Sequence, residues 1–209
     1  MLIVALGDST TAGTPLYKSP VEAPPDGEGN HQSQYAYWLI EKRPFWRVLN
    51  RGVNGERTDE ILLRFDTDVA ERRPYVVVII AGVNDVYQGK PVEHVTTHLR
   101  KLYDRAAEEH IAVVAGSILP FNDATKAQNA KMEKINAWIK AEAKQDPNVT
   151  FVDTRKAVAS KNDRDKLAST EDGQHPDIAG YKKLAHAIEP VIARVMEKSE
   201  ADRRALNHR

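Results

Sequence analysis

A serine, a histidine and an aspartate suited to hydrolytic chemistry stand near opposite ends of the chain. Ser9 lies in ALGDSTTAG, residues 5–13, directly after a short apolar run. His175 lies in EDGQHPDIAGY, residues 171–181, with Asp172 three positions before it. A serine hydroxyl becomes an effective nucleophile when a histidine accepts its proton and a carboxylate orients that histidine. The three residues are therefore candidates for nucleophile, base and orienting acid.

The same segments have explanations that involve no chemistry. A serine at the end of a strand is commonly the N-cap of the next helix, and D-x-x-H before a helix can act only as a cap. A phosphate loop is excluded, because five residues instead of four separate Gly7 from Gly13, and Thr14 follows in place of lysine. No G-x-G-x-x-G or G-x-S-x-G sequence occurs. The hydrolytic interpretation therefore needs further groups around Ser9.

Acyl transfer also requires hydrogen-bond donors for the oxyanion, and two segments offer them. NRGVNGERT, residues 50–58, supplies backbone N–H groups at Gly52 and Gly55. AGVNDVY, residues 81–87, supplies the side-chain amide of Asn84. Asn-Gly and Asn-Asp pairs are equally common in plain turns, so either segment alone is weak evidence.

Alternating strands and helices bring these groups together. Short β-branched runs predict strands, and longer segments with apolar residues at helical spacing predict helices. The predicted strands are residues 2–6, 46–50, 75–81, 111–117 and 149–153, and the predicted helices are 33–42, 58–72, 91–109, 124–145 and 177–198. This alternation indicates an α/β fold, a three-layer α/β/α sandwich with about five parallel strands. Such folds bind ligands at the carboxyl ends of their strands, where Ser9, Gly55 and Asn84 follow three successive strands.

The chain has the size of one domain. Its 209 residues are 41% hydrophobic and 29% charged, which is enough for a single buried core. We expect one domain over residues 1–198 and a charged, frayed tail over residues 199–209.

Two loops are expected to border the reacting serine. Residues 14–32 are rich in proline and predict a long loop that begins beside Ser9. Tyr17 from this loop, and Phe121 from the segment that follows the fourth strand, are candidates for the walls of a substrate pocket. With walls on both sides we expect a small acyl pocket.

Composition narrows the partners and the chemistry. Thirty basic and thirty acidic residues cancel, so nucleic acid is not an expected partner and a small, weakly charged molecule is favoured. The absence of cysteine excludes disulfides, thiolate metal sites and a cysteine nucleophile. His94 and His98 have metal-ligand spacing on a predicted helix, but without a third ligand a solvated helix face is favoured and no metal is expected.

The sequence does not predict a membrane-spanning segment. No stretch approaches the length of a transmembrane span, and the apolar run at residues 2–6 is shorter than the hydrophobic part of a signal peptide. We therefore expect a cytoplasmic protein, or a secreted one if a leader has been removed. Oligomeric state does not follow from the sequence.

Four sequence blocks, taken together, resemble the SGNH hydrolase superfamily, also called GDSL esterases and lipases. They are G-D-S at residues 7–9, the glycine block that ends at Gly55, G-x-N-D at residues 82–85 and D-x-x-H-P at residues 172–176. The blocks occur in the family's order and extend over most of the chain. The resemblance implies a flavodoxin-like fold and a serine esterase that needs no metal or organic cofactor.

The resemblance also implies a role for each candidate residue. Ser9 is the implied nucleophile, His175 the base and Asp172 the carboxylate that orients it. The implied oxyanion hole consists of the N–H groups of Ser9 and Gly55 and the side chain of Asn84.

The resemblance leaves the ester open. A short-chain, acetyl-like ester, such as an acetylated carbohydrate or an aryl ester, is the leading expectation. A lysophospholipid, an acyl thioester and a non-catalytic carbohydrate-binding role on the same fold are the alternatives. Asp8 and Asp85, next to the serine and the asparagine, are implied to brace their loops.

Overall fold

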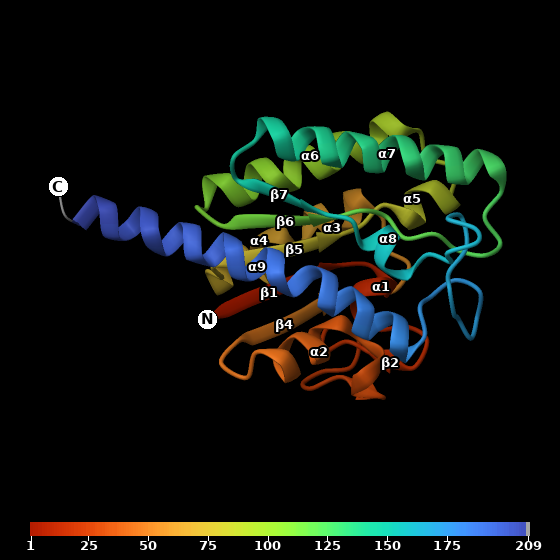
Figure 1. The fold of residues 1–209 in the computed structure, drawn as a ribbon, viewed down its shortest axis with the longest axis horizontal. Helices are drawn as coiled ribbons and strands as arrows, with labels where there is room; N and C mark the ends of the chain where they lie inside the picture. Colours follow the sequence, from red (N-terminus) through yellow and green to blue (C-terminus); the bar gives the residue numbers. More distant parts are fainter. Residues whose placement is uncertain (208–209) are drawn as a thin grey trace.

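A five-stranded parallel sheet forms the centre of the molecule (Figure 1). The computed structural model describes residues 1–207, and the side chains of residues 1–198. In spatial order the strands are β4 (Arg47–Gly52), β1 (Leu2–Gly7), β5 (Val76–Ile80), β6 (Ala112–Gly116) and β7 (Val149–Val152). Every neighbouring pair is parallel. The predicted α/β fold with five parallel strands is confirmed.

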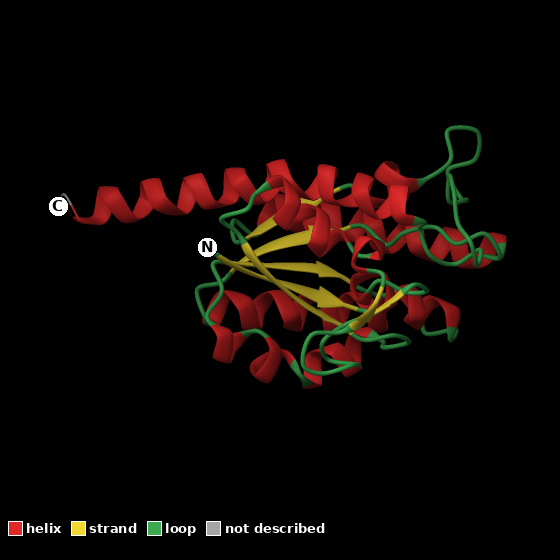
Figure 2. Ribbon diagram, turned by 90° about the horizontal axis from the view of Figure 1, so that it is seen from below, coloured by secondary structure: helices red, strands yellow, loops and turns green. Residues whose placement is uncertain are grey.

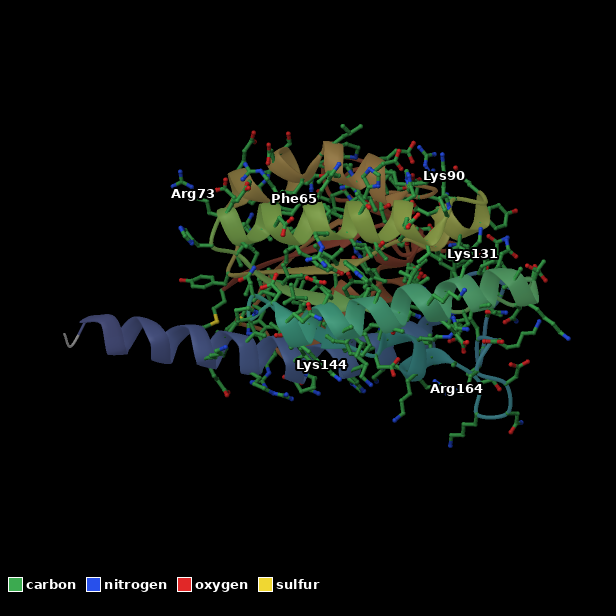
Figure 3. All side chains as sticks on the ribbon, turned by 90° about the horizontal axis from the view of Figure 1, so that it is seen from above. Phe65, Arg73, Lys90, Lys131, Lys144 and Arg164 are labelled. Atoms are coloured by element: carbon green, nitrogen blue, oxygen red, sulfur yellow. The ribbon has the colours of Figure 1, made fainter. Side chains whose placement is uncertain are left out.

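Helices cover both faces of the sheet (Figure 2). One layer contains α2 (Tyr35–Lys42), the short α8 (Thr154–Val158) and the long α9 (Ile178–Asn207). The other contains α3 (Thr58–Leu63), α4 (Phe65–Asp68), α6 (Val92–Glu108) and α7 (Lys126–Gln145). Figure 3 shows α6 and α7 side by side, and Lys131 of α7 donates a hydrogen bond to the carbonyl of Lys90, just before α6.

The central strands are apolar on both faces because alternate residues enter two hydrophobic clusters. In β1, Ile3 and Ala5 belong to the cluster under α2 and α9. Val4 and Leu6 belong to the cluster under α6 and α7. All four side chains are fully buried. This pattern is typical of a parallel sheet between two helical layers, and it makes the sheet a rigid support for the loops at its carboxyl edge.

Several short helices escaped prediction from the sequence. α1 (Ser9–Ala12), α5 (Val83–Tyr87) and α8 have only four or five residues each. Segments of that length are too short to show a 3.6-residue apolar period. The predicted helix at 58–72 is divided into α3, α4 and a 3₁₀ turn, Ala70–Arg72, which is followed by Arg73 with a left-handed backbone.

Residues 14–32 form a compact excursion along the edge of the sheet. It contains a two-stranded antiparallel ribbon, β2 (Tyr17–Lys18) and β3 (Glu28–Gly29), and ends in a 3₁₀ turn at His31–Ser33. Ser19 Oγ donates to the Gly52 carbonyl at 2.6 Å, which fastens the excursion to the end of β4.

α9 passes along the sheet and projects beyond it (Figure 1). It runs through Pro190 to Asn207, past residue 198 where the periodic pattern predicted its end. Residues 208 and 209, the last of the predicted frayed tail, lie outside the described residues. Among residues 1–207, no helix is both long and apolar enough to cross a membrane.

Candidate active site

Ser9 is the first residue of α1, and only Asp8 separates it from the end of β1. Asp8 caps this helix, because its Oδ1 accepts a hydrogen bond from the Thr10 N–H at 3.0 Å. α1 lies so close to β4 that a Cβ at Gly52 would be 2.1 Å from the Ala12 nitrogen. Only glycine fits at position 52, and the close contact fixes Ser9 at the carboxyl edge of the sheet.

Ser9, His175 and Asp172 form one hydrogen-bonded row. His175 Nε2 lies 2.8 Å from Ser9 Oγ, and His175 Nδ1 lies 2.6 Å from Asp172 Oδ2. A carboxylate accepts, so Nδ1 carries the proton and Nε2 is the nitrogen that accepts from the serine hydroxyl. The structure therefore brings together the three residues that the sequence singled out first.

Hydrogen bonds between the Asp172 side chain and nearby backbone N–H groups hold the loop that carries Asp172 and His175. Asp172 Oδ1 accepts hydrogen bonds from the N–H groups of Gln174 and His175, both at 2.8 Å. Burial by itself raises the pKa of Asp172, but hydrogen bonds from the His175 side chain and these two N–H groups outweigh it and lower the pKa to about 2. Asp172 is therefore ionised near neutral pH and can fix the orientation of the imidazole.

The predicted oxyanion donors follow three adjacent strands, β4, β1 and β5. The Ser9 N–H is in the first turn of α1, where a helix offers it no carbonyl partner. The Gly55 N–H makes no hydrogen bond to any described residue, and its backbone has a φ of +81°, which favours glycine. Asn84 Nδ2 donates one hydrogen bond to the Glu56 carbonyl at 2.9 Å, so its second N–H is available to a substrate.

The two aspartates beside these groups brace their loops. Asp85 is fully buried and accepts hydrogen bonds from the N–H of Thr58 at 2.9 Å and from its hydroxyl at 2.8 Å. These bonds tie α5 to the beginning of α3. Burial raises the pKa of Asp85, and it raises the pKa of Asp8 to about 7.

A cleft of about 130 Å³ opens beside Ser9. Its walls come from α1, from the loops after β4 and β6, from α5 and from the His175 loop. The lining residues are Ser9, Thr10, Asn54, Val83, Asn84, Tyr87, Leu119, Pro120, Phe121, Gln174 and His175.

Of the two predicted pocket walls, Phe121 lines the cleft and Tyr17 does not. Phe121 is 4% exposed and meets Tyr87 edge-on, with 6.1 Å between ring centroids. The Tyr17 hydroxyl donates to the Asp26 carbonyl, and its ring lies against His31 in a separate groove beside β4. The prediction for Tyr17 is wrong because the excursion turns toward the edge of the sheet after α1 instead of crossing the serine.

Other lining residues were not predicted. Asn54 precedes Gly55, and Tyr87 ends the helix that begins beside Asn84. Both stand within the segments singled out as oxyanion donors, so nearness to a strand end was the available signal. Which residue of such a segment faces the cleft depends on the turn, and the sequence pattern does not specify it.

Three possible metal ligands cluster next to the site, although none of them lines the cleft. His94 Nε2 is 3.4 Å from Asp59 Oδ1 and 3.5 Å from Asp85 Oδ1. Asp59 also accepts from Arg57, and Asp85 accepts from Thr58. The ligand atoms are thus already engaged in hydrogen bonds within the protein. The partly buried His94 is turned toward these carboxylates, so the predicted solvated face does not describe it.

Comparison with known proteins places this geometry in a family. Residues 5–183 match the GDSL-like Lipase/Acylhydrolase family. A 93-residue stretch is 32% identical to the uncharacterized lipoprotein YqeF of Bacillus subtilis (strain 168), covering 43% of this chain and 35% of that protein. The match therefore spans about a third of the length of this relative.

Solved structures share the fold over almost the whole chain. A GDSL-like lipase from Bacteroides thetaiotaomicron VPI-5482 aligns with a TM-score of 0.74 and 24% identity, over 92% of this chain and 88% of that one. A member of the lipolytic protein G-D-S-L family from Veillonella parvula DSM 2008 gives 0.76 and 18%, over 93% and 99%. A variant of Axe2, an acetyl-xylooligosaccharide esterase from Geobacillus stearothermophilus, gives 0.71 and 23%, over 90% and 91%. The chain belongs to the GDSL-like lipase/acylhydrolase family.

Proposed function

We propose that this chain hydrolyses short-chain, acetyl-like carboxylic esters through an acyl-enzyme formed on Ser9. The observation that carries the proposal is the hydrogen-bonded row from Ser9 Oγ through His175 to Asp172. A helix cap needs neither a base nor an orienting carboxylate. The row therefore favours acyl transfer over the plain capping role that a serine at a strand end commonly has.

Acylation begins when Ser9 Oγ attacks the ester carbonyl carbon and its proton passes to His175 Nε2. The negative charge that develops on the carbonyl oxygen accepts hydrogen bonds from the N–H groups of Ser9 and Gly55 and from the Asn84 amide. The imidazolium then gives the proton to the alcohol oxygen, the C–O bond breaks and the alcohol leaves. Asp172 stays ionised throughout and stabilises the imidazolium.

Deacylation repeats the sequence with water. His175 Nε2 takes a proton from a water molecule, whose oxygen attacks the acyl carbon bound to Ser9. The same donors stabilise the second oxyanion. When this intermediate collapses, His175 returns the proton to Ser9 Oγ, and the carboxylic acid is released.

The size of the cleft supports a short acyl group. About 130 Å³ is well below the several hundred Å³ typical of sites for drug-sized ligands. Apolar Val83, Leu119 and Phe121 lie in its wall, together with the polar groups of Asn54 and Gln174. An acetyl group fits such a space, and the polar rim suits a hydroxylated alcohol such as a sugar. The esterase Axe2, whose fold this chain shares, acts on acetylated xylooligosaccharides.

The first test is hydrolysis of p-nitrophenyl acetate by the purified protein. We expect Ser9→Ala and His175→Ala each to lower kcat by about 10⁴-fold or more, and the double variant to lose little further, because the two residues act as a unit. Asp172→Asn should cost about 10³- to 10⁴-fold. His186→Ala, which removes an exposed histidine of α9, is the matched control and should retain the native rate.

The second test compares substrate classes by kcat/KM. Acetyl to butyryl p-nitrophenyl esters and an acetylated xylooligosaccharide should exceed decanoyl esters, a lysophospholipid and an acyl thioester. In the first test, losses of kcat that add up in the double variant Ser9→Ala/His175→Ala would contradict the shared mechanism. A maximum at decanoate or longer would show that a lysophospholipase or thioesterase role fits better. The cytoplasmic location expected from the sequence remains a proposal that neither assay addresses.

A further inference from the structure

We propose that Arg64 is a positioning residue for the oxyanion hole. Arg64 lies between α3 and α4, does not line the cleft, and has a side chain that is 16% exposed. Its Nη2 donates to the Gly7 carbonyl at 3.0 Å, its Nη1 to the Arg51 carbonyl at 2.8 Å, and its Nε to the Glu56 carboxylate at 2.6 Å. Each nitrogen of the guanidinium thus has its own acceptor.

These acceptors lie on the two chain segments that carry the first two proposed oxyanion donors, Ser9 and Gly55. Gly7 ends β1, two residues before Ser9. Arg51 is near the end of β4, and Glu56 directly follows Gly55. One planar side chain therefore sets the spacing between the nucleophile segment and the glycine donor.

The third donor is reached through Glu56. While the Glu56 carboxylate binds Arg64, its backbone carbonyl accepts the hydrogen bond from Asn84 Nδ2 at 2.9 Å. A shift of Glu56 would rotate the Asn84 amide and move the Gly55 N–H at the same time. Arg64 thereby acts on all three donors without touching the substrate.

The charged groups around Arg64 balance one another. Arg64 and Arg51 both bind the carboxylate of Asp68, whose side chain is 4% exposed. With Glu56 the cluster contains two cations and two anions, so no charge is buried without a partner. Burial raises the pKa of Glu56, and Arg64 acts against that rise. Lysine supplies the charge but lacks the planar fork that reaches three acceptors at fixed angles.

The inference rests on the proposed function, because it assigns the three donors to an oxyanion. Removing a single oxyanion donor commonly costs 10²- to 10³-fold in kcat, and a misplacement of about 1 Å can cost about 10²-fold. We therefore expect Arg64→Lys to lower kcat for p-nitrophenyl acetate by about 10- to 100-fold, with little change in KM. The losses of Arg64→Lys and Asn84→Ala should be less than multiplicative in the double variant, because both act through the same hydrogen bond.

Arg105→Lys is the matched control. Arg105 is a helical arginine on α6 that pairs with three carboxylates, those of Asp66, Glu108 and Glu109, and it does not line the cleft. Its substitution should leave kcat unchanged. Thermal unfolding of both variants, compared with the native protein, separates misplacement of the donors from loss of the fold. If Arg64→Lys is too unstable, Glu56→Gln weakens the same contact and keeps the backbone carbonyl.

A second readout is independent of activity. The Asn84 side-chain amide protons should exchange slowly with solvent in the native protein, because one is bound to Glu56, and faster in Arg64→Lys. Native kcat in a folded Arg64→Lys or Glu56→Gln variant, or unchanged exchange at Asn84, would overturn the inference. If the native protein hydrolyses no ester but exchange at Asn84 still accelerates in the variant, the positioning role stands and the proposed function fails.

Discussion

The side-chain amide of Asn84 has two protons with separate tasks. One is bound to the Glu56 carbonyl, and this bond sets the plane of the amide. The other is then directed by that plane instead of rotating freely. A donor fixed before the substrate arrives needs no reorganisation in the transition state, which is why such groups contribute more to kcat than to binding.

Replacement of Asn84 by alanine should therefore affect turnover selectively. We expect kcat for p-nitrophenyl acetate to fall by about 10²- to 10³-fold, with KM nearly constant. Steady-state kinetics with the native protein and Asn84→Ala provides the measurement. A rise in KM at native kcat would instead make Asn84 a group that binds the substrate in its ground state.

Single residues also show where sequence patterns succeed and fail. Ser9, His175 and Asp172 were predictable, because the chemistry requires these types and the spacing from Asp172 to His175 is local. The contacts of Arg64 were not predictable, since they depend on how the loop after β4 folds back toward the end of β1. Tyr17 was misplaced because sequence distance from the serine does not give the direction in which a loop turns.

The excursion of residues 14–32 is hydrogen-bonded to the loop after β4, which carries the proposed oxyanion donor Gly55. Glu22 Oε1 accepts the N–H of Asn54 at 2.9 Å, and its Oε2 accepts the N–H of Ser19 at 3.1 Å. The carboxylate thus joins the excursion to the residue before Gly55. This role differs from the pocket wall that the sequence suggested.

Removal of the Glu22 carboxylate should make the position of the Gly55 N–H less fixed. Glu22→Ala is expected to lower kcat for p-nitrophenyl acetate by about 3- to 10-fold, because the Asn54–Gly55 turn is no longer held at its N–H. Glu28→Ala, in the same excursion, removes an exposed carboxylate that pairs only with Lys18 among residues 1–198 and should leave the rate unchanged. Equal rates for both variants and the native protein would remove the excursion from the catalytic support.

Two aromatic rings form part of the cleft wall. Phe121 comes from the loop after β6, Tyr87 comes from α5, and the two rings meet edge-on. Shortening Phe121 to alanine should move the optimum of a p-nitrophenyl ester series toward longer acyl chains, because it opens an apolar space next to the acyl carbon. Phe45→Ala, which alters a side chain that is 93% exposed, is the control. An unchanged chain-length profile in a folded Phe121→Ala variant would place the acyl group elsewhere.

The strands and long helices were predictable to within a few residues, apart from the end of α9, which lies at Asn207 instead of residue 198, while the elements at the site were not. Buried strands such as β5 consist of β-branched residues, and α6 and α7 are long enough to repeat an apolar stripe. α1 and α5 carry the reacting groups but have only four and five residues. Tertiary contacts, chiefly the close approach of α1 to β4, decide their conformation.

At the scale of the whole molecule, the fold buries the carboxyl group of Asp8 next to Ser9. This burial lowers the free energy of unfolding near neutral pH. Asp8 is 1% exposed, and burial raises its pKa from 3.8 to about 7, with the charges of Asp85 and Glu56 acting in the same direction. A carboxyl group with a higher pKa in the folded state binds its proton more tightly there. Folding stability is therefore lost as the pH rises from about 4 to about 7.

Asp8→Asn should remove that dependence while keeping an acceptor for the Thr10 N–H. Between pH 5 and pH 8 the free energy of unfolding of the native protein should fall relative to Asp8→Asn by about 2–3 kcal/mol, from 1.36 kcal/mol per pH unit below the raised pKa. Urea unfolding at the two pH values measures it. Asp104→Asn on the exposed side of α6 reports the general effect of losing one acidic side chain. Parallel curves for native protein and Asp8→Asn would show that Asp8 does not take up a proton on folding.

The parallel arrangement of the strands also separates the ends of the chain from the cleft. All five strands run in one direction, so Met1 lies at the amino edge of the sheet, and α9 projects past that same edge (Figure 1). Ser9 and the cleft residues lie at the opposite edge. A protein immobilised on a resin through either of these ends would therefore face its cleft toward the liquid, and a fused partner would not obstruct the entry of an ester.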